Sequence, residues 1–359
     1  MKQKQRVAVA MSGGVDSATV AALLLEQGYE VVGLTMALWS PSPGEPPPGS
    51  RACCAPEDAY DARRVADTLG IPFYMVDLEE TFREEVVADF ITAYASGRTP
   101  NPCVRCNQTV KFNHLLAKAR ALEATFLATG HYAIQEESRN GQPLLRRGRD
   151  RSKDQSYFLF ATTLAQLGYL RFPLGDLTKE ETRKLAERFG LHVADKRESQ
   201  DICFIPDQDM AGFFARQSPH LLTPGEIVDQ QGQALGSHRG VGLYTIGQRK
   251  GLGIAAPEPL YVTRIDPEQN RLVVGPASSL YRPSLEVMDL NWLGEHPPSA
   301  GDSVSVRIRY AAEPTPARLE PQADDALRVV FDTPQRAVTP GQACVFYQGD
   351  RVLGGGWIC

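Results

Sequence analysis

A short run of small and polar residues at positions 12–17 (SGGVDS) has the composition of a loop that binds phosphate. It stands between an apolar, strand-like run at residues 7–11 and a helix-like run at residues 18–27. A strand that turns through two glycines into a helix leaves backbone N–H groups exposed at the helix N-terminus, where phosphate is the usual ligand. An ordinary capped helix is the alternative interpretation of so short a motif.

The individual residues of this run suit a polyphosphate. Gly13 and Gly14 let the backbone approach an anion closely, and Ser12 and Ser17 add hydroxyl donors. Asp16 is out of place beside phosphate unless a magnesium ion or a tight turn holds it. The sequence lacks the lysine-bearing GxxxxGK[ST] loop of kinases and GTPases, which disfavours γ-phosphoryl transfer.

Three cysteines stand in contexts that suit chemistry. Cys103 and Cys106 form a CxxC pair in a proline-punctuated segment, residues 97–107, which we interpret as a loop ahead of a helix starting near Lys111. Cys203 follows about a hundred residues later, after a polar stretch. A lone CxxC fits half a zinc site as well as a redox pair. Thiolates beside an arginine and near a helix N-terminus are expected to have lowered pKa values and to be nucleophilic.

Five cationic side chains crowd eight positions of the sequence: Arg146, Arg147, Arg149, Arg151 and Lys153. A charge run of this kind is usually a solvated surface. The amide and aromatic side chains that follow it favour RNA, because guanidinium groups bind phosphates while glutamine and tyrosine hold an exposed base. Both interpretations stay open from the residues alone.

The elements that position these residues can be read from the apolar pattern. Apolar runs at residues 7–11, 31–38, 73–78 and 126–133 alternate with helix-like stretches and predict an α/β fold, a parallel sheet covered on both faces. Ligands of such sheets bind beyond the carboxyl ends of the strands, where residues 12–17, Met36 and Gly130 all fall.

After Pro224 the sequence pattern changes to short runs rich in β-forming residues, which are broken by glycine, proline and aspartate. These runs predict two small β-rich domains after the α/β domain. We therefore expect domains at residues 1–218, which include a helical extension, and at residues 219–280 and 281–359.

Length and composition predict an ordinary globular protein of two or three domains. The 359 residues are 42% hydrophobic and 23% charged, and no apolar stretch approaches the ~18 residues of a membrane span. The N-terminus shows no export signal, so a cytoplasmic location is expected. A net charge of -5 argues against indiscriminate nucleic-acid binding but leaves local basic patches free to act. We assign the adjacent Cys53 and Cys54 to packing or loop structure.

Several motifs together resemble one known family. Besides SGGVDS they are TPNPCVRCN (99–107), ATGHY (128–132), KDQSYFL (153–159), SQDICFI (199–205), YTIGQRKGL (244–252) and the closing GGGWI. With them the chain resembles the bacterial tRNA-specific 2-thiouridylase (MnmA) family of the ATP-pyrophosphatase superfamily. The likeness runs from about residue 5 to residue 358.

The resemblance implies a fold and an activity. The fold is a parallel-sheet PP-loop domain with a helical extension, followed by two small β-rich domains, the last of them barrel-like. The activity is ATP-dependent 2-thiolation of the wobble uridine, position 34, of tRNA, by adenylation of the uracil C2 oxygen, sulfur transfer from a cysteine persulfide, and release of AMP and pyrophosphate. The implied co-substrates are ATP with Mg²⁺ and persulfide sulfur. The implied partners are tRNA and an upstream sulfur donor, a cysteine desulfurase or a sulfur-relay protein.

The resemblance also implies roles for particular residues and no metal site. Cys106 is the implied nucleophile, and Cys203 is the implied persulfide carrier that forms a transient disulfide with Cys106. Some members of the family carry aspartate where this chain has Cys103. The implied nucleotide contacts are Ala10, Met11, Ser12, Gly13, Gly14, Val15, Asp16, Ser17, Met36 and Gly130. The implied tRNA contacts are Asn101, Pro102, Cys103, Lys153, Asp154, Gln155, Arg309 and Tyr310.

Three other functions stay open. One is a different ATP-pyrophosphatase, such as an amidating ligase. A second is an iron–sulfur-dependent thiolase in which Cys103, Cys106 and Cys203 hold a cluster. The third is a non-catalytic RNA-binding module that retains a nucleotide loop.

Overall fold

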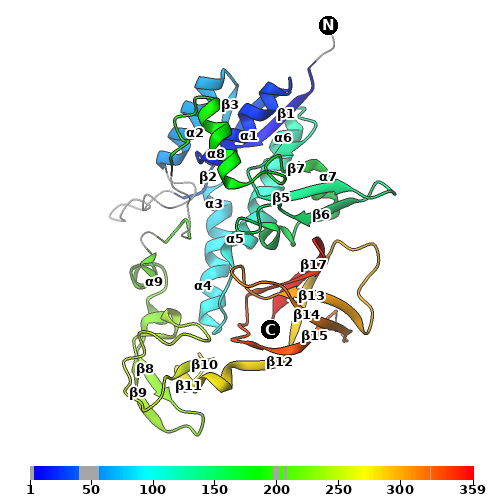
Figure 1. The fold of residues 1–359 in the computed structure, drawn as a ribbon. Coiled ribbons are helices and arrows are strands. Elements are labelled where there is room, and N and C mark those ends of the chain that lie inside the picture. The colour runs from blue at the N-terminus through cyan, green and yellow to red at the C-terminus, as the bar shows by residue number, and fades with distance from the viewer. Residues whose placement is uncertain (1–3, 40–55, 197–201, 206–207, 324) are drawn as a thin grey trace. The chain divides into compact units, whose positions relative to one another are not determined.

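The computed structural model describes residues 4–39, 56–196, 202–205, 208–323 and 325–359 (Figure 1). Cys53 and Cys54 lie outside the described residues, as does the start of the SQDICFI motif. The chain divides into two compact units. The first comprises Met1–Val87, Pro102–Gln208 and Asp350–Val352, and the second comprises Ala88–Asn101, Asp209–Gly349 and Leu353–Cys359.

A five-stranded parallel sheet forms the centre of the first unit, with the strand order β3-β2-β1-β4-β7. Its strands are β1 (Arg6–Ala10), β2 (Glu30–Ala37), β3 (Phe73–Asp77), β4 (Leu127–Ala128) and β7 (Leu170–Arg171). The four apolar runs of the sequence correspond to β1–β4, which confirms the predicted parallel sheet. The sequence did not reveal β7, because this two-residue strand, unlike β4, does not lie in a continuous apolar run.

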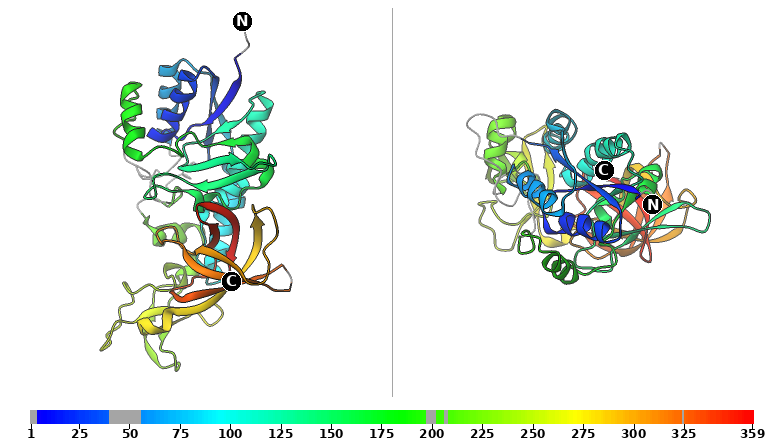
Figure 2. Two further views of the ribbon diagram at one scale, coloured as in Figure 1. Left: turned by 45° about the vertical axis from the view of Figure 1, so that its right-hand side comes forward. Right: turned by 90° about the horizontal axis from the view of Figure 1, so that it is seen from above.

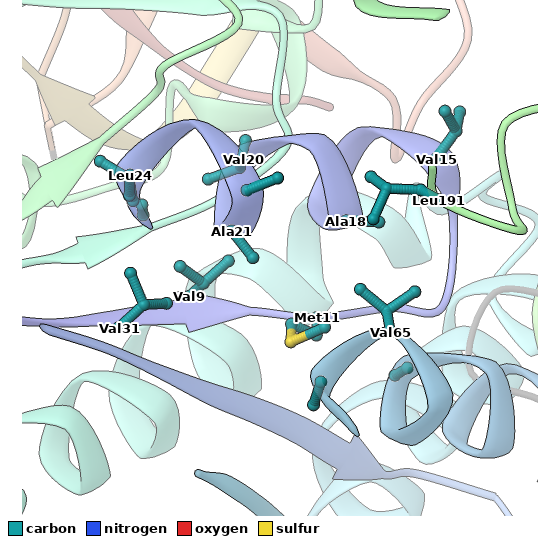
Figure 3. Close-up of a cluster of buried hydrophobic side chains, with 14 of the residues drawn as sticks. Val9, Met11, Val15, Ala18, Val20, Ala21, Leu24, Val31, Val65 and Leu191 are labelled. Carbon is teal, nitrogen blue, oxygen red and sulfur yellow. The ribbon is translucent and has the colours of Figure 1, made fainter. Parts of the chain in front are cut away.

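Both faces of the central strands are buried, as is usual for a parallel sheet. On one face, Val7 and Val9 of β1 belong to the same core as the apolar side chains of α1 (Val15–Glu26), and Figure 3 shows Val9 beneath that helix. Ala8 and Leu34 point to the opposite face and are also fully buried. The turn between β1 and α1 is therefore held by a packed core on both sides of the strand.

Helix α8 (Lys179–Arg188) lies beside α1 (Figures 1 and 2), and its Ala186 belongs to the same core. A capping box starts it: the Thr178 hydroxyl accepts from the Glu181 N–H, and the Glu181 carboxylate accepts from the Thr178 N–H.

Short helices extend the first unit. Helix α3 (Glu79–Phe82) runs into a π-helical segment at Arg83–Val87, and α5 (Pro102–Arg105) runs into a π-helix at Cys106–Leu115. The loop expected over residues 97–107 is therefore wrong from Pro102 onward. Proline fits the first turn of a helix, where its missing N–H has no intrahelical partner to lose.

The other elements of the first unit are α2 (Pro56–Leu69), α6 (Leu116–Ala121), β5 (Ala133–Glu137), β6 (Pro143–Arg147), the 3-10 helix Ser156–Leu159 and α7 (Leu164–Tyr169). Strands β5 and β6 form an antiparallel hairpin. The Arg/Lys-rich run begins on this hairpin.

The second unit contains the β-rich part of the chain. A four-stranded sheet has the order β10-β11-β8-β9, and a barrel closes because β12 pairs with both β15 and β17. The sheet is formed by β8 (Gly225–Val228), β9 (Ala234–His238), β10 (Tyr261–Asp266) and β11 (Arg271–Gly275). The barrel is formed by β12 (Tyr281–Trp292), β13 (Asp302–Arg307), β14 (Thr315–Pro321), β15 (Leu327–Arg336), β16 (Ala343–Gln348) and β17 (Arg351–Ile358). Two small β-rich folds after the α/β domain were predicted and are confirmed.

The helices of the second unit are α4 (Ala88–Ala95), α9 (Met210–Gln217) and the 3-10 turns Pro219–Leu222, Val241–Leu243 and Ala277–Leu280. Phe90 of α4 packs edge-on against Phe213 of α9, with ring centroids 5.9 Å apart. The barrel has its own core, to which Leu319, Val329 and Phe346 contribute.

Candidate active site

The SGGVDS segment forms a tight loop between β1 and α1. Gly13 has a φ of 70°, and Gly14 is the extended N-cap residue of α1. The Ser17 hydroxyl accepts a hydrogen bond from the Ser12 N–H at 3.1 Å and donates to the Gly14 carbonyl at 3.2 Å. No side chain caps α1 in the part of the chain that the structure describes. The first N–H groups of this helix therefore suit an anion.

The glycines of this site differ in what a Cβ atom would meet at each position. A Cβ at Gly13 would lie 2.1 Å from the Asp58 carbonyl oxygen, and one at Gly130 would lie 2.9 Å from the Asp16 Cβ. At Gly13 and Gly130, neighbouring protein atoms therefore leave no room for a side chain. At Gly14 the nearest neighbour is the Ser12 Oγ at 3.6 Å, so a phosphate can approach the backbone there.

Asp16 is held by two side chains that were not among the predicted site residues. The Lys179 ammonium donates to both Asp16 carboxylate oxygens at 2.8 Å, and the Tyr132 hydroxyl donates to Oδ1 at 2.9 Å. The Tyr132 hydroxyl also lies 2.9 Å from the Thr182 Oγ1. One sequence signal could have identified Lys179: it occupies the first turn of a helix, where the macrodipole disfavours a cation.

A second lysine bonds to the loop itself. The Lys196 ammonium donates to the Gly13 carbonyl at 3.2 Å and to the carboxylates of Asp58 and Asp61, each at 2.6 Å. Burial alone would lower the pKa of Lys196, but its hydrogen bonds to the two carboxylates raise it. Lys196 is therefore a cation, and it too was missed in the sequence.

Cys103 and Cys106 lie one turn apart on the helix that begins at Pro102. Cys103 is exposed, whereas Cys106 is half-buried at the start of the π-helix. The adjacent Asn107 is buried; its side-chain amide donates to the Phe158 carbonyl at 3.1 Å, and its Oδ1 accepts from the Lys111 ammonium at 2.9 Å. These bonds fix the turn that carries Cys106. π-Helical segments frequently mark functional sites.

Cys203 is half-buried and also belongs to the first unit. Its neighbour Phe204 is almost fully buried and packs edge-on against Phe82, with ring centroids 5.7 Å apart. The ring of Trp39, just beyond β2, lies 6.3 Å from the Phe204 ring. The aromatic anchor, which we define as Trp39, Phe82 and Phe204, therefore holds Cys203 near the carboxyl end of β2.

His131 packs edge-on against two rings, those of Phe112, in the π-helix that begins at Cys106, and of Phe172. Each ring centroid is 6.1 Å from that of the imidazole. Its Nδ1 is 2.7 Å from the Thr129 Oγ1. Burial, with a smaller contribution from the Lys111 ammonium, lowers the pKa of His131 to about 3. The imidazole is therefore neutral at physiological pH.

The basic run, residues 146–153, contributes to the packing of the fold, which its composition does not indicate. Arg147 is buried and donates from Nε to the Asp154 carboxylate at 2.8 Å. The other Asp154 oxygen accepts from the backbone N–H groups of Gly148 and Ser156. Asp154, an expected tRNA contact, is therefore buried and holds this turn, while Lys153 next to it is half-buried.

The remaining arginines of the run form ion pairs near the surface. Arg146 pairs with Glu136, Arg149 with Glu181, and Arg151 with Asp350. Gln155, another expected tRNA contact, accepts through Oε1 from the Tyr132 N–H at 3.1 Å. The Arg149–Glu181 pair and the Gln155–Tyr132 bond connect the run to α8 and to Tyr132, which contact Asp16.

The other predicted site residues are placed as follows. Met11 and Met36 are buried at the ends of β1 and β2. Arg309 and Tyr310 belong to the second unit; Arg309 donates to the Arg336 carbonyl, and Tyr310 is exposed. Asn101 is half-buried at the end of a second-unit segment, directly before Pro102.

The described residues contain neither a metal-type cluster nor a membrane-spanning helix. No set of three or more His, Cys, Asp and Glu side chains in that part of the chain is arranged to hold a metal ion. Among the same residues, no helix has both the length and the apolar character needed to cross a membrane.

Comparisons with known proteins give a consistent result along the chain. Residues 5–207 match the family described as tRNA methyl transferase HUP domain, residues 213–276 the tRNA methyl transferase PRC-barrel domain, and residues 282–358 the aminomethyltransferase beta-barrel domain. The first of these matches alone covers more than half of the chain.

Full-length relatives carry a single name, tRNA-specific 2-thiouridylase MnmA. The protein of Magnetococcus marinus is 62% identical over 358 residues, covering 100% of both chains. The protein of Geotalea uraniireducens is 50% identical over 99% of this chain and 95% of its own, and that of Rhodospirillum centenum is 54% identical over 99% of this chain and 92% of its own. Identity at this level along the whole length shows that the chain belongs to the tRNA-specific 2-thiouridylase MnmA family.

Proposed function

We propose that this protein is a sulfurtransferase that converts the wobble uridine, position 34, of tRNA to 2-thiouridine. The observation that carries this proposal is the combination, in one compact unit, of an uncapped phosphate-type loop at residues 12–17 with Cys106 and Cys203. The full-length relatives, named 2-thiouridylases, support the same reaction.

The first step that we propose is activation of uracil. Its C2 carbonyl is a poor electrophile, so its oxygen must become a leaving group before sulfur can replace it. In this proposal the oxygen attacks the α-phosphorus of ATP, the bond to the β-phosphate breaks, and pyrophosphate leaves. The N–H groups at the start of α1, together with Ser12 and Ser17, bind the pyrophosphate portion, and Mg²⁺ neutralises its charge. Ala10, Met36 and Gly130 complete the nucleotide contacts.

The second step replaces oxygen by sulfur. The terminal sulfur of a persulfide on Cys203 attacks C2 and expels AMP, and the Cys106 thiolate then attacks the Cys203 sulfur. The carbon-bound sulfur leaves as the thiocarbonyl, and Cys106 and Cys203 become a disulfide. Alternatively, the Cys106 thiolate first attacks the Cys203 sulfur of the persulfide and releases hydrosulfide, which then adds to C2 and expels AMP. Both routes balance only when an external thiol reductant reopens the disulfide.

The substrate and the sulfur source complete the proposal. We expect tRNA to contact Asn101, Pro102, Cys103, Lys153, Asp154 and Gln155, with Arg309 and Tyr310 contributing from the second unit. The target base must leave its stack to be reached. A cysteine desulfurase or a sulfur-relay protein supplies the persulfide, and we place the reaction in the cytoplasm. We keep the domain limits at residues 1–218, 219–280 and 281–359, which the ranges of the matching families support.

An assay of the thiols tests the mechanism. Protein is incubated with unmodified tRNA, ATP, a persulfide donor and a thiol reductant, and the nucleosides are analysed by mass spectrometry. We expect 2-thiouridine at position 34, and no product from Cys106→Ser or Cys203→Ser. The matched controls Cys103→Ser and Cys103→Asp should keep substantial activity, because Cys103, although an expected tRNA contact, takes no part in the proposed sulfur transfer.

The same variants distinguish the cluster mechanism. A cluster held by Cys103, Cys106 and Cys203 predicts that serine at any of the three abolishes activity, and that anaerobically purified protein contains stoichiometric iron and sulfide. Iron-free protein that thiolates with an added persulfide excludes it. A protein that binds tRNA without any tRNA-dependent release of pyrophosphate would instead be a non-catalytic binding module.

A further inference from the structure

We propose that Lys196 is a positioning residue of the nucleotide site: its ammonium group fixes the peptide between Gly13 and Gly14 so that the Gly14 N–H faces the bound phosphate. The inference rests on the proposed use of this loop for ATP. It assigns a role to a lysine that lies 183 residues from the loop in the sequence.

The contacts of Lys196 account for all three of its protons. The ammonium group donates to the Gly13 carbonyl and to one carboxylate oxygen each of Asp58 and Asp61. Only 27% of the Lys196 side chain and 10% of the Asp58 side chain are exposed to solvent. A cation bound in this way has no proton left for a phosphate oxygen, which favours an indirect role.

The geometry of the peptide between Gly13 and Gly14 shows how Lys196 can act on the phosphate site indirectly. No peptide bond among the described residues is cis, and in a planar trans peptide the C=O and the following N–H point in opposite directions. The Gly13 carbonyl points to Lys196, so the Gly14 N–H points away from it. Gly13 is left-handed, and Gly14 is extended with open space around its Cα, so a phosphate can approach the Gly14 N–H closely.

The backbone of Lys196 is itself held in place by a hydrogen bond from α8. The Arg183 guanidinium, on α8, donates to the carbonyl of Lys196 at 3.2 Å and to that of Ala194. Asp61 also lies 3.6 Å from the His192 Nε2. With Lys196 removed, Asp58 and Asp61 would lose the ammonium group that now offsets their negative charge, close to a loop that has to accept a polyphosphate. Lys196 therefore both orients the loop and neutralises the carboxylates behind it.

Nucleotide binding measured without turnover tests this inference. The dissociation constant of α,β-methylene-ATP with Mg²⁺ is measured by calorimetry for the full-length protein, for Lys196→Met and for Lys196→Arg. We expect Lys196→Met to bind the analogue at least fivefold more weakly, Lys196→Arg to recover part of that loss, and tRNA affinity to stay within twofold. A loss of less than fivefold in Lys196→Met overturns the proposal. Lys184→Met, an exposed lysine on α8, is the matched control.

The double variant Asp58→Asn, Asp61→Asn separates positioning from direct contact, and it serves alone if Lys196→Met does not fold. If Lys196 acts by positioning, releasing its ammonium weakens analogue binding at least fivefold. A smaller effect, or tighter binding, means that Lys196 contacts phosphate itself and overturns the proposal. Because these measurements need no thiolation, they stay informative if the protein fails to make 2-thiouridine, a failure that would count against the proposed function alone.

Discussion

Lys179 donates hydrogen bonds from its ammonium group to both carboxylate oxygens of Asp16, each at 2.8 Å. The pair joins the first turn of α8 to the first turn of α1. It explains how a carboxylate remains beside a loop built for phosphate: a cation from another helix neutralises it.

Removing Lys179 should therefore harm both stability and activation. The Lys179 side chain is 12% exposed, and Lys179→Met takes the cation away from the Asp16 carboxylate while the Tyr132 hydroxyl still donates to it. We expect the free energy of unfolding of the first unit to fall by about 1 to 3 kcal/mol, measured by urea denaturation. Pyrophosphate release should fall as well, because an uncompensated carboxylate repels the nucleotide.

Lys184→Met is the control for that experiment. Lys184 pairs with Glu180 on the exposed face of the same helix, and exposed pairs contribute little to stability. We expect no measurable change in the urea midpoint. Equal effects of the two substitutions would show that the Lys179–Asp16 pair has no special role.

Asp16→Ala and Ser17→Ala should separate nucleotide chemistry from RNA binding. Both side chains belong to the phosphate loop, and Ser17 is nearly fully buried within it. We expect tRNA-dependent pyrophosphate release to be abolished while tRNA retardation in a gel stays nearly unchanged. Loss of both properties together would mean that the loop has a structural role only.

The basic run should divide into one structural residue and one RNA contact. Arg147→Met should destabilise the first unit by roughly 3 kcal/mol, because it leaves the buried Asp154 carboxylate without its cation. Lys153→Ala should leave stability unchanged and, by removing a single bond to phosphate, reduce the slope of log affinity for tRNA against log salt by about 0.7 to 0.9. Fluorescence anisotropy over a salt series measures that slope. An unchanged slope in Lys153→Ala would identify the run as a solvated surface.

His131 should make the protein sensitive to mild acid. Its pKa is about 3 in the folded protein and 6.5 in an unfolded chain, so the unfolded state takes up the proton first as the pH falls. The free energy of unfolding is therefore unaffected by this titration above pH 6.5. It declines between pH 6.5 and pH 3, by at most about 1.4 kcal/mol per pH unit. The difference in unfolding free energy between wild type and His131→Gln, measured from pH 7 to pH 4.5, should follow this slope. A difference that does not change with pH would contradict it.

The aromatic anchor should matter for sulfur transfer and not for activation. Trp39→Ala removes a ring whose centroid lies 6.3 Å from that of Phe204, next to Cys203. We expect slower thiolation with unchanged pyrophosphate release, and nearly normal thiolation in Trp39→Phe, which keeps an aromatic ring. Single-turnover assays measure the two steps separately. Equal loss of both steps in Trp39→Ala would show that the anchor stabilises the whole unit.

Local patterns were enough to predict much of the fold. The runs that became β1–β4 are continuous apolar stretches, and the capping box that starts α8 is formed by close neighbours in the chain, so both kinds of signal are local. The SGGVDS loop was predicted for the same reason: its function depends on a strand, two glycines and a helix in direct succession. The start of the cysteine helix was missed, because the prolines before Cys103 indicate a loop as readily as a first helical turn.

The electrostatic partners of the site were decided by tertiary structure alone. Asp16 and Lys179 are 163 residues apart, and Gly13 and Lys196 are 183 apart, so no local pattern connects them. The basic run shows the same limit, since its composition does not reveal that Arg147 is buried against Asp154 while the neighbouring arginines pair at the surface. Residue types and spacing specify which chemistry is possible at a turn. The pairing of charges across the fold depends on how helices pack, and that is settled only when the core between them forms.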